Sequence, residues 1–189
     1  MSDIAVVPQH VVCRGERFRL YLDPETIASR VRAIGESINR DYDGQQPILI
    51  GVLNGAYMFL ADLMREIQID CEVDFLKLSS YGEAKVSSGE VTELKKIDAQ
   101  IEGRHVVVIE DIVDTGLSMD YIKRLMLEEK PASIRLATLL HKKAATRDDL
   151  NLNLDYVGFE IDNLFVIGYG LDYGQLARNL PAIYILDED

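Results

Sequence analysis

Residues 106–118 read VVVIEDIVDTGLS, and this stretch decides how the chain folds. The apolar, β-branched run at 106–109 is typical of a strand that is buried on both faces of a parallel sheet. Two adjacent carboxylates, Glu110 and Asp111, end the run, a third, Asp114, follows, and a Thr-Gly-Leu-Ser turn then opens an amphipathic helix. Ligands of open α/β sheets bind outside the carboxyl ends of the strands, so the stretch predicts a ligand site as well as a fold.

The turn and the carboxylates suit different parts of a phosphorylated sugar. Free backbone N–H groups at the start of a helix attract anions, and the hydroxyls of Thr115 and Ser118 add donors. Gly116 lets the backbone approach a phosphate closely. The carboxylates can accept hydrogen bonds from a sugar diol or hold a divalent cation through its water molecules. The alternative is a core strand followed by an acidic helix entry, because capping residues are common at helix starts.

Strands and helices alternate along the rest of the chain. Asp23-Pro24-Glu25 predicts a helix start, since it combines a capping side chain, a proline in the first turn and an acid near the helix dipole. This alternation predicts an α/β fold with a parallel twisted sheet flanked by helices on both faces. We expect strands at 48–53, 73–78, 106–109, 134–140, 156–161 and 165–170, and helices at 55–67 and about 118–129.

Composition excludes several classes of protein. The 189 residues, 48% of them hydrophobic, fit one domain with a sizeable core. No N-terminal stretch resembles a signal peptide and no run is long enough to span a bilayer, so we expect no membrane contact. The formal net charge of −12 argues against binding to nucleic acid, which needs a basic surface. Cys13 and Cys71 lack metal-ligand spacing, which makes a reducing cytoplasm the expected location.

Several segments together resemble one family. The sequence EDIVDTG at 110–116 resembles the phosphoribosyl pyrophosphate signature of type I phosphoribosyltransferases. Residues 52–56 resemble the pyrophosphate loop of that family, and 73–75 with 80–81 resemble the strand that enters its mobile lid. Three later segments resemble its purine-binding parts, namely 139–143, 157–161 and 171–173. Taken together and in this order along the chain, the matches resemble the hypoxanthine-guanine branch of the family rather than the adenine, orotate or uracil enzymes.

The resemblance implies a fold, an activity and an assembly. The fold is the type I phosphoribosyltransferase fold, one domain over 1–189, with a small hood formed by the chain ends, about 1–22 and 160–189, and a lid at about 79–97. The activity is Mg-dependent purine salvage, in which hypoxanthine or guanine and phosphoribosyl pyrophosphate give IMP or GMP and pyrophosphate. The implied assembly is a homodimer or homotetramer.

The resemblance also implies a role for each site residue. Asp114 would be catalytic and handle the proton on the imidazole edge of the purine. Lys142 would donate to the exocyclic oxygen and select oxopurines, because an ammonium group has only donors. Phe165 would stack on the purine, and Val166 would offer backbone groups to its edge. Three of these residues have an alternative: Asp114 as a helix-capping aspartate, Lys142 as a solvated lysine and Phe165 as a core residue.

The remaining implied contacts are to ribose, phosphate and metal. Substrate would be bound by Asn54, Gly55, Ser80, Tyr81, Glu110, Asp111, Thr115, Gly116, Leu117, Ser118, Lys142, Phe165, Val166, Asp172 and Arg178. Magnesium would be held by Glu110, Asp111 and Asp172. Ser80 and Tyr81 would touch substrate only when the lid is closed, and the guanidinium of Arg178 suits a bidentate contact with pyrophosphate.

The chain departs from the family pattern at Asn54, where relatives commonly carry lysine in the pyrophosphate loop, and at Leu117, which is sometimes lysine. Pyrophosphate binding is therefore expected to be weaker or to depend more on backbone N–H groups. Two other readings stay open at this point. One is a phosphoribosyltransferase for xanthine or another base, and the other is a nucleotide-binding regulator on the same fold.

Overall fold

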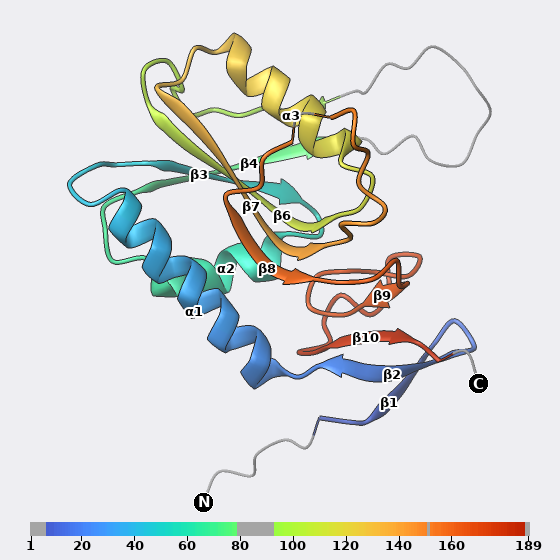
Figure 1. Cartoon of the computed structure of the whole chain (residues 1–189). Helices are drawn as coiled ribbons and strands as arrows, with labels where there is room; N and C mark the ends of the chain where they lie inside the picture. Colours follow the sequence, from blue (N-terminus) through green and yellow to red (C-terminus); the bar gives the residue numbers. More distant parts are fainter. Residues whose placement is uncertain (1–6, 79–92, 151, 188–189) are drawn as a thin grey trace, which may run out of the picture.

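Two sheets organise the chain, a large one that is mostly parallel and a small antiparallel one (Figure 1). The computed structural model describes residues 7–78, 93–150 and 152–187. The strand order of the large sheet is β5-β4-β3-β6-β7-β8, and all neighbours in it are parallel except β4 and β5. Its strands are β3 Ile48–Leu53, β4 Glu72–Leu78, β5 Glu93–Lys95, β6 His105–Val113, β7 Ser133–His141 and β8 Tyr156–Glu160.

The helices cover both faces of the large sheet, as expected. They are α1 Pro24–Asp41, α2 Tyr57–Glu66 and α3 Leu117–Glu128. α1 and α2 lie on one face and α3 on the other (Figure 1). The reason is that β4 is added on one side of β3 while β7 is added on the opposite side of β6, so two right-handed crossovers place their helices on opposite faces.

The alternation of side chains along β6 confirms that this strand is buried on both faces. Val107 packs in the cluster with α1 and α2, and Val108 in the cluster with α3. All four residues of 106–109 are fully buried. Successive side chains of a strand point to opposite faces, so each helix layer receives every second residue.

The first helix begins where its capping signal predicts. The carboxylate of Asp23 accepts a hydrogen bond from the backbone N–H of Thr26 at 2.7 Å, and Pro24 occupies the first turn. An apolar face formed by Ile27, Val31, Ile34 and Ile38 is buried against the sheet. No helix within the described part of the chain is long and apolar enough to cross a membrane.

The small sheet joins the two ends of the chain, with strand order β1-β2-β10-β9. Its strands are β1 His10–Cys13, β2 Glu16–Leu22, β9 Val166–Ile167 and β10 Ile183–Leu186. Phe18 and Tyr184 are fully buried in its core. The expected parallel sheet with a small hood built from the chain ends is therefore confirmed, while the proposed limits of hood and lid stay predictions.

Two expected strand lengths were wrong. The strand expected at 165–170 contains only two paired residues, because 168–170 all have positive φ and leave the extended conformation. The strand expected at 106–109 continues to Val113. Its pairing with β3 stops at Ile109, whereas its pairing with β7 continues to Val113. Glu110 and Asp111 thus lie on the strand, at the point where β3 diverges from it.

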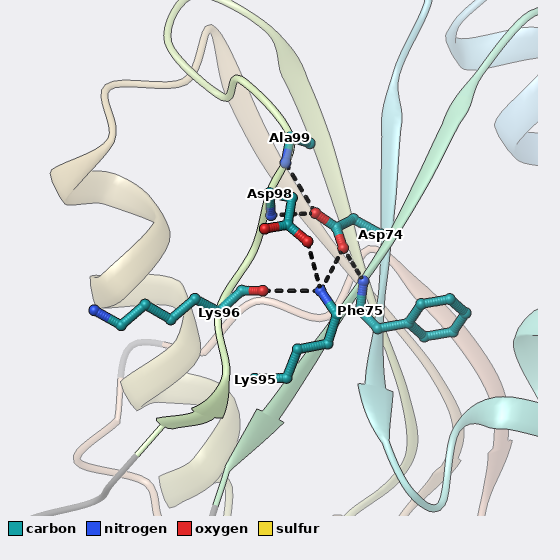
Figure 2. Close-up of polar contacts among 6 residues, drawn as sticks. All are labelled: Asp74, Phe75, Lys95, Lys96, Asp98 and Ala99. Carbon is teal, nitrogen blue, oxygen red and sulfur yellow. Dashed lines mark hydrogen bonds and ion pairs between the residues drawn. The ribbon is translucent and has the colours of Figure 1, made fainter.

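A buried carboxylate fixes the chain where it returns to the large sheet at β5 (Figure 2). Asp74, on β4, accepts hydrogen bonds from Lys95 Nζ at 2.9 Å and from the backbone N–H groups of Asp98 at 2.6 Å and Ala99 at 2.9 Å. It also accepts one from the N–H of Phe75 at 2.7 Å. Burial alone would raise the pKa of Asp74, but these donors outweigh it and lower the pKa to about 2.

Asp74 should therefore make folding stability depend on pH in acid. An unfolded Asp takes up its proton near pH 3.8, whereas folded Asp74 does so only near pH 2. Its contribution, about 2 kcal/mol, is complete above pH 3.8 and is lost as the pH falls to about 2. Denaturant unfolding of the protein and of Asp74→Asn should show a stability difference that shrinks over this range. Asp98→Asn, at an exposed carboxylate, is the control. A difference that does not change with pH would contradict this account.

Candidate active site

Most of the predicted site residues gather at the carboxyl ends of β3, β6 and β7, which are neighbours in the sheet. The strand order reverses between β3 and β6, since β4 lies on the far side of β3 and β7 on the far side of β6. Such a reversal leaves a crevice at the carboxyl ends of the two central strands, where ligands of open α/β sheets bind. The loops at 54–56 and 114–116 both begin there.

The loop after β3 lies directly against a carboxylate of β6. A Cβ atom placed on Gly55 would come within 1.8 Å of Asp111 Oδ2, so only glycine allows this approach. The peptide bond between Leu53 and Asn54 is cis, and the side chain of Asn54 is exposed. The loop then turns into α2 through a hydrogen bond from the N–H of Ala56 to the carbonyl of Val52 at 3.2 Å.

Glu110 and Asp111 form a desolvated acidic pair. Both are buried, and Asp111 Oδ1 accepts from the N–H of Ile112 at 2.9 Å. Burial, with added repulsion from Asp111, raises the pKa of Glu110 well above its usual value. Burial also raises the pKa of Asp111, although its hydrogen bonds and the charge of Arg178 act against that rise. A divalent cation or the hydroxyl groups of a sugar would stabilise both carboxylates in their charged form.

The turn after β6 presents donors at the start of α3. Gly116, with a φ of 84°, precedes the helix, and no side chain of the described residues caps the first turn. Thr115, Leu117 and Ser118 are exposed. The backbone N–H groups of this first turn are therefore free for an anion, as the sequence predicts.

The segment after β7 packs on this turn and aligns two predicted site residues. Lys142 Nζ lies 2.9 Å from Asp114 Oδ2, with the lysine buried and the carboxylate half exposed. The N–H of Lys142 donates to the carbonyl of Val113 at 2.9 Å. Thr146 Oγ1 donates to the carbonyl of Asp114 at 2.8 Å and lies 3.1 Å from that of Lys142. The alternative of a solvated lysine is thereby excluded.

Thr146 was missed by the sequence analysis. Its hydroxyl links the backbones that carry Asp114 and Lys142, so it fixes their relative position. The signal was a threonine four residues after Lys142, a spacing at which the hydroxyl can reach back to a carbonyl. The bond to Asp114, 32 positions away, could not be read from the sequence.

A distant segment completes the crevice beside the loop after β3. Arg178 pairs with Asp172, with Nη2 and Oδ1 2.6 Å apart, and donates from Nη1 to the carbonyl of Gly170 at 2.7 Å. A Cβ on Gly170 would lie 2.1 Å from the carbonyl oxygen of Gly55. Asp172 and Arg178 are thus brought next to the predicted pyrophosphate loop, although well over a hundred residues separate them from it.

Val166 begins β9 of the small sheet, and Phe165 immediately precedes it. The ring of Phe165 is 44% exposed and packs edge-on against Tyr173, with the centroids 5.2 Å apart. Such an exposed ring does not fit the alternative of a core phenylalanine. Val166 is buried and pairs with Ile185, so any contact with a base would come from its backbone. Ser80 and Tyr81 lie outside the described residues, and their roles stay predictions.

A metal centre made from protein groups alone is absent in the described ranges, where no three His, Cys, Asp or Glu side chains converge on one point. The magnesium contacts expected of Glu110, Asp111 and Asp172 stay predictions. The donor chemistry of Glu110 and Asp111 still fits magnesium, which keeps several waters and is commonly bound by one or two carboxylates together with substrate phosphates.

Comparisons with known proteins agree with this geometry. Residues 21–174 match the model of the phosphoribosyl transferase domain. Hypoxanthine-guanine phosphoribosyltransferase of Bacillus subtilis is 42% identical over 168 residues, covering 89% of this chain and 92% of the relative. The bifunctional protein TilS/HprT of Listeria monocytogenes is equally similar, but this chain spans only 26% of its length.

Solved structures show the same similarity. The crystal structure of a hypoxanthine phosphoribosyltransferase from Staphylococcus aureus superimposes with a TM-score of 0.83 at 37% identity, covering 89% of this chain and 91% of that one. The family resemblance found in the sequence is therefore confirmed: the chain belongs to the phosphoribosyltransferase family.

Proposed function

We propose that this chain transfers the phosphoribosyl group of phosphoribosyl pyrophosphate to hypoxanthine or guanine, giving IMP or GMP and pyrophosphate. A bond forms between a ring nitrogen of the purine and the anomeric carbon of the ribose, while the bond from that carbon to pyrophosphate breaks and the purine loses a proton. The observation that carries the proposal is the contact between Lys142 and Asp114 at 2.9 Å. The names of the relatives support the same reaction.

This contact provides one donor and one acceptor side by side. An oxopurine protonated at N7 presents an N–H donor next to its exocyclic oxygen, so Asp114 would accept from the first and Lys142 would donate to the second. Adenine carries an amino group in place of the oxygen. This group and the ammonium of Lys142 are both hydrogen-bond donors, so neither would have an acceptor in the other. A site built to donate to an oxygen discriminates strongly against such an analogue.

The rest of the crevice would hold the sugar phosphate and the leaving group. The N–H groups at the start of α3 suit the 5′-phosphate. Pyrophosphate would lie between the backbone of Gly55 and the guanidinium of Arg178, which are linked through Gly170. Asn54 supplies amide donors where relatives carry a charge, so the backbone and Arg178 have the larger part in this contact.

Magnesium fits the acidic side of the crevice. Glu110 and Asp111 would hold it together with oxygens of the substrate, and Asp172 would contribute when Arg178 turns from it to pyrophosphate. The bound ion supplies positive charge that stabilises the departing pyrophosphate. The protein itself would hold the reactants in line and would help to neutralise the negative charge that grows on pyrophosphate.

Assembly as a homodimer or homotetramer and a cytoplasmic location are parts of the same proposal. Both cysteines, Cys13 and Cys71, are free thiols, as expected in a reducing compartment. The acidic net charge of −12 supports the absence of a nucleic-acid partner and opposes a regulator that binds RNA.

The decisive experiment is to incubate the protein with phosphoribosyl pyrophosphate, magnesium and one base at a time, and to follow nucleotide formation. Hypoxanthine and guanine should react, adenine should not, and chelation of magnesium should abolish the reaction. Xanthine also carries an oxygen next to N7, so its rate separates the proposal from the alternative of a xanthine enzyme. Absence of product with every oxopurine would refute the proposed function.

Asp114→Asn should reduce turnover about 100-fold or more, because an amide cannot take up the purine proton. The fold should persist, since the carboxylate of Asp114 is half exposed and the amide oxygen of asparagine can still accept a hydrogen bond from Lys142. Steady-state kinetics and thermal unfolding measured on the same sample test both statements. Near-normal turnover would remove Asp114 from the proposed role.

Lys142→Ala should raise KM for hypoxanthine and guanine by about tenfold or more, because the exocyclic oxygen loses its donor. The KM for phosphoribosyl pyrophosphate should change little. Lys143→Ala is the matched control, since Lys143 is exposed and paired only loosely with Glu160 at 3.4 Å. Equal kinetics of the two variants would show that Lys142 does not select the base.

A further inference from the structure

The turn at 168–170 has an unusual backbone. Its residues all have positive φ, of 95° at Gly168, 50° at Tyr169 and 99° at Gly170. Glycine adopts such angles freely, whereas a bulky residue does so only when its surroundings hold it there. Tyr169 is buried, and its hydroxyl donates to Asp62 Oδ2 at 2.7 Å. The tyrosine therefore fixes this turn through its side chain.

This turn touches both groups that would bind pyrophosphate. Gly170 leaves no room for a Cβ against the carbonyl of Gly55, which would lie 2.1 Å away. The N–H of Gly170 donates to the carbonyl of Arg178 at 3.0 Å, and Arg178 Nη1 donates back to the carbonyl of Gly170 at 2.7 Å. A shift of the turn would thus move Arg178 and the loop at Gly55 relative to one another.

Asp62 connects the turn to that same loop by a second route. It lies on α2, the helix that begins two residues after Gly55. The hydroxyl of Tyr169 therefore closes a ring of contacts that runs from the loop through α2 to Asp62, across to the turn, and back through Gly170 to Gly55. A groove of about 340 Å³ between α1 and α2 is lined by both Asp62 and Tyr169.

We infer that Asp62 and Tyr169 are positioning residues for the pyrophosphate end of the site. Neither belongs to the groups assigned to substrate, and their hydrogen bond sets the distance between Gly55 and Arg178. The inference rests on the proposed function. It extends that function, because it assigns the geometry of pyrophosphate recognition to a contact outside the crevice. This contact would position the loop that carries Asn54 where relatives commonly have lysine.

The test compares variants that remove or keep this hydrogen bond. Tyr169→Phe and Asp62→Ala should each raise KM for phosphoribosyl pyrophosphate about tenfold. Each should also weaken the binding of magnesium pyrophosphate, measured by calorimetry, by the same factor. KM for the base should stay within about twofold, and the double variant should be no worse than either single one. Asp62→Asn keeps an oxygen that accepts from the hydroxyl and should restore most of the affinity.

The matched control is Tyr184→Phe. Tyr184 is also fully buried, and its hydroxyl makes one hydrogen bond, to the carbonyl of Pro8 at 3.1 Å, in the small sheet. This variant should lose similar stability with no change in either KM. Unchanged pyrophosphate affinity in Tyr169→Phe, or equal effects in both tyrosine variants, would overturn the inference while wild-type transferase activity still supported the proposed function. An inactive wild-type protein would instead refute the function itself.

Discussion

The close contact between the backbone of Gly55 and the carboxylate of Asp111 is the constraint on which the site depends. It exists because β3 and β6 stop pairing at Ile109, so the chain after β3 turns across the end of β6. One surface then combines main-chain donors from the loop with acidic oxygens from the strand. Gly170 and Arg178 complete that surface from the far end of the chain, because the absence of a Cβ at Gly170 leaves room for the carbonyl of Gly55.

This arrangement explains how a chain with a net charge of −12 can bind a strongly anionic substrate. The acidic groups assigned to the crevice are Glu110, Asp111 and Asp172, whose chemistry suits magnesium and ribose, and Asp114, which is paired with Lys142. In the proposed function, phosphate groups would be bound by backbone N–H groups at the start of α3 and by Arg178. Local donors and a bound cation, rather than the net charge of the chain, determine the field at such a site.

The sequence predicts the architecture because it depends on local signals. The run at 106–109 alternates between two faces, and Asp23 caps the first helix through a residue three positions away. It does not predict the length of β6, since charged residues can continue a strand when a neighbour such as β7 still pairs with it. Contacts such as Tyr169 with Asp62 join residues 107 positions apart, and no local pattern specifies them. The Asp74 and Thr146 anchors were missed for the same reason.

The most direct test of the account is a crystal structure of the protein with magnesium pyrophosphate and IMP. The account places the 5′-phosphate on the N–H groups at the start of α3, the ribose hydroxyls beside Glu110 and Asp111, and pyrophosphate between Gly55 and Arg178. The hypoxanthine oxygen should lie within hydrogen-bond distance of Lys142. Density for the nucleotide at another place, or pyrophosphate held away from both Gly55 and Arg178, would contradict it.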